Sequence, residues 1–184
     1  MEAATDAGSV TEQMRKRDEQ AKAIIKRQTY WAIGLGIIPF PLIDVAAVTA
    51  AQLKMIASLA NLYGQEFSQS WGKSVLGALV GGVGAAGLAH GSFGSMVKAI
   101  PGVGLLFGLV AMPTMSGATT YAVGKVFHLH FSSGGTMLNF DVEKMRRYYE
   151  QQLQEGVKVA ENATASGRSA STSSSAGNYG NPAS

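Results

Sequence analysis

The sequence SVLGALVGGVGAAGLAHGSFGSMV occupies residues 74–97, and AIPGVGLLFGLVAMPTMSGATTYAVG follows at residues 99–124. Neither stretch contains Lys, Arg, Asp or Glu, and only Lys98 separates them. An apolar helix of about 20 residues is long enough to cross the hydrocarbon core of a bilayer, and both stretches reach that length. The two stretches therefore predict an apolar helical hairpin at 74–124 that is re-entrant or spans a membrane.

Glycine is abundant in both stretches, although it disfavours helices in water by about 1 kcal/mol relative to Ala. Gly77 and Gly81 form one G-x-x-x-G spacing, and Gly104 and Gly108 form another. Each spacing places two glycines on one helix face, where a neighbouring backbone can come close. These four residues are therefore predicted helix-packing sites, and we expect the chain to form a homo-oligomer through them.

Four residues ahead of the first apolar run predict contact with a membrane interface. Lys26 and Arg27 precede Tyr30 and Trp31, and basic residues beside Tyr and Trp are typical of the headgroup region. The alternative is an ordinary solvated helix whose aromatic side chains enter a core. Both interpretations stay open at this point.

Two prolines and the helix behind them mark the next segment. Pro39 and Pro41 end the preceding helix because neither can donate a helical hydrogen bond. Asp44 is expected to cap the next helix, which carries an apolar stripe. Gln52 lies beside that stripe and is either a structural hydrogen-bond anchor or a contact to a partner.

The remaining segments differ in charge and complexity. A charged helix, a connector with an amphipathic helix, and two polar ends surround the apolar centre. Composition rich in Ser and Gly cannot bury enough surface to offset the entropy of ordering, so the tail is expected to be disordered. The predicted organisation is a disordered N-terminus at 1–9, a charged-to-apolar helix at 10–38, a helical core at 39–131, a connector and amphipathic helix at 132–159, and a disordered Ser-rich tail at 160–184.

No motif supports catalysis, a cofactor or a metal. Residues 82–87 match G-x-G-x-x-G, but no acidic residue follows at the spacing that a dinucleotide site requires. Phe67 stands where a phosphate-binding loop ending in Gly-Lys-Ser would need its first glycine. His128 and His130 could chelate a metal from one face of a strand, but no carboxylate has suitable spacing. We therefore expect no enzyme, cofactor or metal site.

The composition also limits the partners. Charged residues make up only 15% of the 184 residues, and the net charge is +3. No dense basic stripe interleaved with aromatic residues is present, so nucleic acid is not expected as a partner. Cysteine is absent, and no signal peptide pattern is visible.

Three segments, IIPFPLIDVAAVTAAQLKMIASLANLYG, AIPGVGLLFG and ATTYAVGKVF, resemble the bacterial domain of unknown function 697 family, which includes YcjF-like membrane proteins. The resemblance covers residues 24–131. It implies a helical, membrane-associated module that works with a separate GTPase, because many members follow an Era-like GTPase domain. It carries over no catalytic residue. The matching positions are Pro39, Pro41, Asp44, Thr49, Gln52, Met55, Tyr63, Gly64, Pro101, Gly102, Gly104, Thr120 and Gly124.

The sequence thus predicts an all-α protein of about five helices that acts as a membrane-associated structural or adaptor protein. Membrane lipid is the expected partner, a separate GTPase is a second one, and the helix at 44–63 is the expected docking surface. Basic residues at both ends place the termini in the cytoplasm, at the bacterial inner membrane. The alternatives are a soluble, cytoplasmic oligomeric bundle that acts as an interaction module, and a pore former.

Overall fold

The computed structural model describes the backbone of residues 2–35, 41–89 and 104–176 and the side chains of residues 8–35, 46–82 and 112–166. These ranges contain helices and connecting turns but no strand. The predicted all-α class with five helices is therefore confirmed. The helices are α1 (Glu2–Leu35), α2 (Pro41–Leu62), α3 (Gln69–Ala89), α5 (Gly104–Ser132) and α6 (Val142–Ala176), and a short 3₁₀ helix, η1 (Met137–Asn139), precedes α6.

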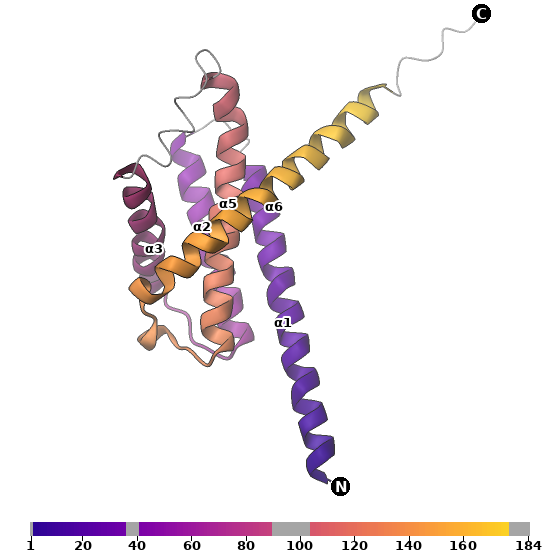
Figure 1. Ribbon diagram of the computed structural model, residues 1–184, viewed down its shortest axis with the longest axis vertical. Coiled ribbons are helices and arrows are strands. Elements are labelled where there is room, and N and C mark those ends of the chain that lie inside the picture. The colour runs from indigo at the N-terminus through magenta and orange to yellow at the C-terminus, as the bar shows by residue number, and fades with distance from the viewer. Residues whose placement is uncertain (1, 36–40, 90–103, 177–184) are drawn as a thin grey trace, which may run out of the picture.

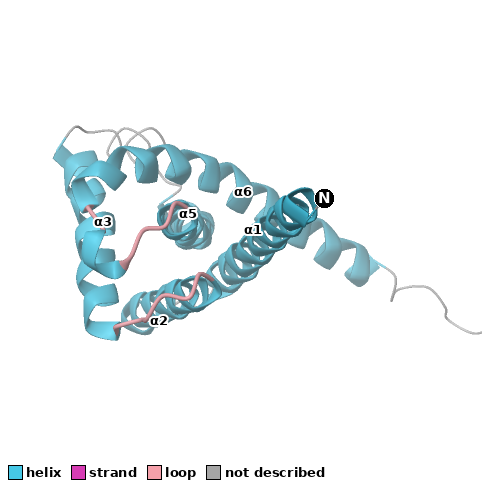
Figure 2. Ribbon diagram, turned by 90° about the horizontal axis from the view of Figure 1, so that it is seen from below, coloured by secondary structure: helices cyan, strands magenta, loops and turns pink. Residues whose placement is uncertain are grey.

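Helix α5 is the centre of the bundle. Seen end-on, it lies inside a ring made by α1, α2, α3 and α6 (Figure 2), and its main contacts are with α6, α1 and α2. A helix that is apolar over most of its circumference has to be largely buried, and most of the described side chains of α5 are buried, although Met112 and Leu129 are exposed. The buried side chains that point in different directions around it include Ala118, Thr120, Val123, Val126, Phe127 and Phe131.

The two uncharged stretches form separate helices that have different neighbours. Helix α3 contacts α6 and α2, whereas α5 contacts α6, α1 and α2. The edge of the Trp71 ring meets Phe127 at a centroid distance of 6.0 Å and so links α3 to α5. The principal cover of α5 is therefore α6, which crosses it diagonally (Figure 1), rather than the other half of the predicted hairpin. Within the described helices, none is both long and apolar enough to cross a membrane.

The two glycines of α3 that were predicted to pack, Gly77 and Gly81, have no close neighbour among the described residues. Gly77 and Gly81 are exposed, and a Cβ atom built on either would meet no atom within 4 Å. Their expected packing against a neighbour is thus absent from the described contacts of this chain, and packing against another copy stays a prediction. Gly104 and Gly108 lie on α5 outside the described side chains.

Other glycines bring the helices together. A Cβ atom on Gly156 of α6 would lie 2.7 Å from the backbone oxygen of Ala118 on α5. One on Gly124 of α5 would lie 2.8 Å from Ile25 of α1 and 3.0 Å from Met55 of α2. Real Cβ atoms rarely approach this closely, so these glycines permit the contacts of α5 with its three neighbours.

A buried polar pair joins α2 to α5. Gln52 is only 4% exposed, and Thr120 is fully buried. Gln52 Nε2 donates hydrogen bonds to Thr120 Oγ1 at 3.1 Å and to Thr119 Oγ1 at 3.4 Å. A buried amide requires such partners. Of the two roles open to Gln52, the structure supports the hydrogen-bond anchor.

The apolar stripe of α2 is not a free docking surface, which corrects that expectation. Leu53, Met55, Ile56 and Leu59 are all buried in the common core, because α2 packs against α1 and α5. These four side chains are therefore not available to a partner.

The outer helices are longer than the sequence suggested. Helix α1 begins at Glu2, so the expected disorder at 1–9 is wrong beyond the first residue, and Ala and Glu there favour helix. Helix α6 extends to Ala176, far into the predicted disordered tail. Its middle is held by tertiary packing, since Ala160 is fully buried. Local composition could not reveal that support.

The boundaries near α2 and α5 also differ from the expectations. Pro41 opens α2 at a position where its missing amide costs little, so Asp44 falls in the first turn and not at the cap. Gly64 ends α2 with a left-handed φ of 70°, as expected. Helix α5 continues past Pro113 to Ser132, the first residue of the predicted connector. Pro39, Pro101 and Gly102 lie outside the described residues.

The two histidines lie on α5, where a two-residue step turns side chains to nearly opposite sides. His128 Nε2 lies 3.2 Å from Asp18 Oδ1 of α1, whereas His130 Nε2 contacts the Thr136 backbone oxygen at 2.8 Å. They therefore cannot chelate one ion as they would on a strand. Among the described residues, no three His, Asp or Glu side chains gather around a possible metal position.

Burial lowers the pKa of His128, while Asp18 raises it and Lys125 lowers it further. The Lys22 ammonium, hydrogen-bonded to Asp18, lowers the pKa of that carboxyl. The folded state thus holds His128 neutral and Asp18 charged at neutral pH.

The replacements Gly156→Ala and Gly77→Ala should have opposite effects on stability. The methyl group at position 156 would meet the α5 backbone, and such overpacking costs roughly 1–3 kcal/mol. The methyl group at position 77 meets open space and should add up to about 1 kcal/mol through helix propensity. Thermal or urea unfolding measures both changes. Equal stability of the two variants would show that α6 does not approach α5 in this way.

The His128→Gln replacement should remove part of the pH dependence of stability. Because the folded pKa of His128 lies below its unfolded value, its neutral form stabilises the fold above about pH 6.5, and that stability is lost as the pH falls. The unfolding temperature should therefore drop less for the variant than for the native chain between about pH 7.5 and pH 5. Asp18 titrates at more acidic pH and does not interfere. An unchanged pH slope would contradict the buried, neutral histidine.

Candidate functional site

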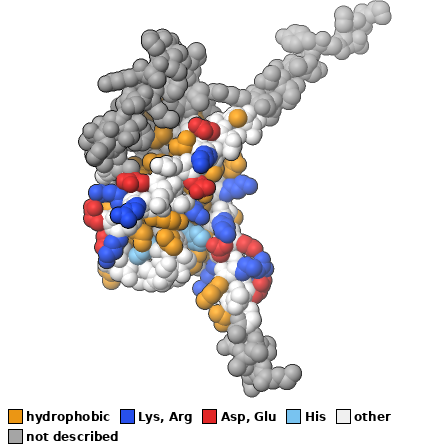
Figure 3. Space-filling model, viewed as in Figure 1, with side chains coloured by type: hydrophobic (Ala, Val, Ile, Leu, Met, Phe, Trp, Pro, Cys, Tyr) orange, Lys and Arg blue, Asp and Glu red, His pale blue; other side chains and the backbone are white. Residues whose placement is uncertain are grey.

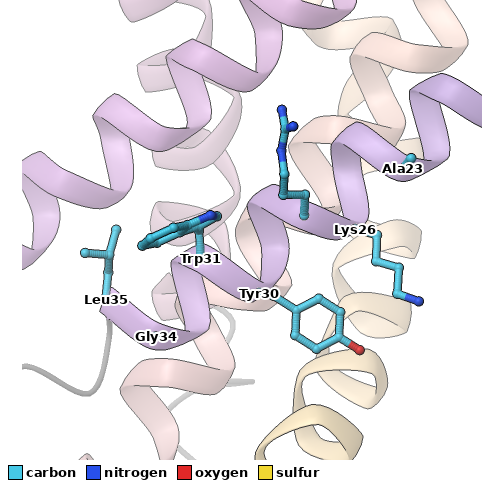
Figure 4. Close-up of a pocket in the computed structure, with 7 residues that line it drawn as sticks. Ala23, Lys26, Tyr30, Trp31, Gly34 and Leu35 are labelled. Carbon is cyan, nitrogen blue, oxygen red and sulfur yellow. The ribbon is translucent and has the colours of Figure 1, made fainter.

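The outer face of α1 carries two large aromatic side chains in solvent. Trp31 is 63% exposed and Tyr30 is 49% exposed. Together with Lys26 and Arg27 they line a shallow groove of about 730 Å³ (Figure 4). We refer to Lys26, Arg27, Tyr30 and Trp31 as the basic-aromatic surface. The rings are outside the bundle, so the interpretation in which they enter a core is wrong.

The helical repeat of α1 explains this exposure. Ala21, Ile25, Thr29 and Ala32 recur at steps of three or four residues and are buried, because this face of α1 packs on α5. Residues on one helix face lie three or four positions apart, so the basic-aromatic surface is turned outward. Figure 4 shows Lys26 and Tyr30 on one side of α1 and Trp31 on the other.

Charge on this part of α1 is unbalanced. Nearer the N-terminus, Arg15 pairs with Glu12 at 2.8 Å and with Glu19 at 2.5 Å, and acidic and basic side chains adjoin there (Figure 3). Lys26 and Arg27, by contrast, form no ion pair with any described residue, and the groove has no acidic residue among its described lining. The surface therefore offers two positive charges beside two amphipathic rings.

Such a surface fits a partner that has an anionic outer layer over an apolar interior. Trp and Tyr place an apolar ring and a polar group at the boundary between hydrocarbon and water. Lys and Arg extend their apolar stems along the same boundary and keep their charges in the headgroup layer. Interfacial helices combine these two properties on one face.

A smaller cavity beside this surface escaped the sequence analysis. It has a volume of about 330 Å³, and α1, α5 and α6 all contribute to its wall, with Lys22, Tyr121 and Lys125 among the lining residues. The available signals were the four-residue step from Lys22 to Lys26 and the isolated charge of Lys125 in an otherwise uncharged helix. Neither signal shows that α1 and α5 lie together.

The positions that carry the family resemblance form scaffold contacts where the structure describes them. Gln52 and Met55 on α2 meet Thr120 and Gly124 on α5, through the hydrogen bond at 3.1 Å and the close approach at Gly124. These residues lie far apart in the sequence but build one interface. They hold α5 in place and contribute nothing to the basic-aromatic surface.

Comparison with known proteins gives two matches. The model of the family described as domain of unknown function matches residues 4–157. The chain is also 44% identical over 144 residues to magnetosome membrane protein 22 of Magnetospirillum gryphiswaldense, covering 78% of this chain and 74% of that protein. No solved structure matches the chain. Because the family model spans most of its length, the chain belongs to the domain of unknown function 697 family.

Proposed function

We propose that this chain is a membrane-associated helical protein that contacts the bilayer through the basic-aromatic surface of α1. The observation that carries the proposal is the exposed pair Tyr30 and Trp31 beside the unpaired Lys26 and Arg27. The similarity to a magnetosome membrane protein supports it. Cytoplasmic leaflets of bacterial membranes attract such basic residues when they carry anionic lipids, so we place the contact on the cytoplasmic face.

The expected affinity of one such surface is modest. Each Lys or Arg near an anionic bilayer contributes about 1 kcal/mol, which gives about 2 kcal/mol for Lys26 and Arg27. The two rings add about 25 cal/mol for each Å² of apolar area that leaves water. Binding of this strength is reversible. Several copies acting together would bind far more firmly than one.

Self-association would bring several copies of the basic-aromatic surface to the membrane at once. The face of α3 that carries Gly77 and Gly81 is exposed, and nothing in the described chain occupies the space beside either glycine. A neighbouring helix could approach such a face closely. We infer that this face, and not the buried stripe of α2, contacts a second copy.

An adaptor role extends the same proposal. The family resemblance favours a separate GTPase as the protein that this chain would hold at the membrane. Co-purification from native membranes tests the idea, since the partner should be recovered with the native chain. Recovery of the chain without any GTPase would remove this part of the proposal and leave the membrane contact intact.

A second candidate function is a soluble oligomeric bundle that acts as an interaction module. It is favoured by the enclosure of α5 within helices of the same chain, which leaves little need for lipid around that helix. The two candidates differ in what the basic-aromatic surface binds. Vesicle binding supports the first, and a stable oligomer that ignores vesicles supports the second.

The Trp31→Ala replacement should weaken vesicle binding. Withdrawal of the indole from the interface removes roughly 1.5–3 kcal/mol of burial, which corresponds to about tenfold or more in partitioning. Co-sedimentation with vesicles of phosphatidylcholine and phosphatidylglycerol measures the change. Leu138→Ala is the matched control, because Leu138 is 99% exposed on η1, away from this surface. Equal losses in both variants, or no loss in either, would contradict the assignment of α1.

A further inference from the structure

The cavity between α1, α5 and α6 has the dimensions and charges of a small-ligand site. Its volume of about 330 Å³ lies at the lower end of the range found for ligand pockets. Lys26 and Tyr30 line both this cavity and the groove of the basic-aromatic surface. The cavity therefore opens beside the part of α1 for which we propose bilayer contact.

Three lysines converge on the cavity from two helices. Lys22 and Lys26 are one turn apart on α1, and Lys125 comes from α5. Lys22 pairs with Asp18 at 2.5 Å, whereas Lys26 and Lys125 have no carboxylate partner in the described structure. Two lysines thus line one cavity without an ion-pair partner among the described residues.

Two nearby carboxylates face this part of the cavity wall, and neither forms an ion pair with Lys26 or Lys125. Asp18 is held by Lys22 and by the His128 ring. The charge of Glu155 of α6 acts on Tyr121 in the cavity wall. Burial raises the pKa of Tyr121, and Glu155 raises it further, so the phenol keeps its proton at neutral pH and can donate a hydrogen bond.

A buried hydroxyl without a partner lies in the same wall. Thr29 is 1% exposed, and its Oγ1 makes no hydrogen bond to the described protein. The comparable threonines Thr119 and Thr164 donate to the carbonyl four residues earlier in their own helices. A buried hydroxyl left unpaired costs free energy. Because Thr29 also lines the cavity, a ligand bound there would be a candidate partner for this hydroxyl.

We propose that this cavity is a phosphate-binding site, in which the Nζ atoms of Lys26 and Lys125 pair with the phosphate oxygens and the hydroxyls of Tyr30, Tyr121 and Thr29 donate to them. The apolar walls, Ile25 and Val159, suit a phosphate ester better than a bare ion, because they contact the carbon side of the ester. The site stands on its own geometry. Its occupation by a lipid headgroup rests on the proposed membrane function.

A titration without any membrane tests the site. Glycerol 3-phosphate and inorganic phosphate are added separately to the full chain, with sodium chloride of equal ionic strength as the reference, and the backbone amide NMR shifts are followed. Saturable shifts at Thr29, Tyr121 and Lys125, absent with chloride, are expected. Shifts that do not saturate, or that chloride reproduces, would overturn the proposal.

Variants separate the cavity from general surface charge. Lys125→Gln should weaken glycerol 3-phosphate binding by about tenfold, as expected for loss of one charge-assisted hydrogen bond. Thr29→Val keeps the shape of the side chain and should weaken binding by a few-fold. Lys73→Gln, which removes an exposed lysine of α3, should have no effect. If Lys73→Gln weakens glycerol 3-phosphate binding equally, the binding is due to non-specific surface charge, and the proposed site is refuted.

Vesicles then identify the source of the phosphate. If the headgroup is the occupant, Lys125→Gln loses the preference for vesicles with phosphatidylglycerol over pure phosphatidylcholine. If that preference survives while glycerol 3-phosphate binding is lost, the site is supported and its occupant is a soluble phosphate ester. If no variant and not even the native chain binds vesicles, the membrane function fails, and the titration still decides the phosphate site.

Discussion

The need to bury α5 on every side governs this structure. Its buried side chains point in several directions around the helix, so no single neighbour can cover it. Helices α1, α2 and α6 share the task. Glycines at the crossings make the contact close: a Cβ atom on Gly156 would meet the backbone of Ala118, and one on Gly124 would meet Ile25 and Met55. The Gln52–Thr120 hydrogen bond then fixes α2 against α5 with one specific polar contact.

Helix α6 shows how much this constraint can override composition. Its C-terminal half is polar and rich in small residues, which by itself favours disorder. Yet Tyr149, Leu153 and Ala160 are buried along one face, so the first part of the helix packs on α5. Once that part is fixed, continued helix costs little for each added residue, because nucleation is the expensive step. The length of α6 is thus a consequence of its packing.

The two faces of α1 have different roles: one packs in the core, and the other carries the proposed function. One face supplies Ala21, Ile25 and Ala32 to the core, and the opposite face presents Tyr30 and Trp31 with Lys26 and Arg27. Lys26 and Tyr30 stand between the groove and the smaller cavity and line both. A bilayer contact and a phosphate site on this helix would therefore act as one continuous surface. The family positions at the α2–α5 interface pack these two helices together and are not part of that surface.

The helical class and the end of α2 at Gly64 followed from the sequence, because helix propensity and the left-handed conformation of glycine are local properties. The sequence could not predict which helix surfaces contact one another. The uncharged stretches indicated burial, but apolar composition does not distinguish lipid from protein as the surrounding medium. Only the tertiary structure assigned α6 as the cover of α5, placed the packing at Gly117, Gly124 and Gly156 instead of Gly77 and Gly81, and brought Lys125 to the lysines of α1. Those outcomes depend on how distant helices cross, and crossing geometry is decided by the sum of contacts over the whole bundle.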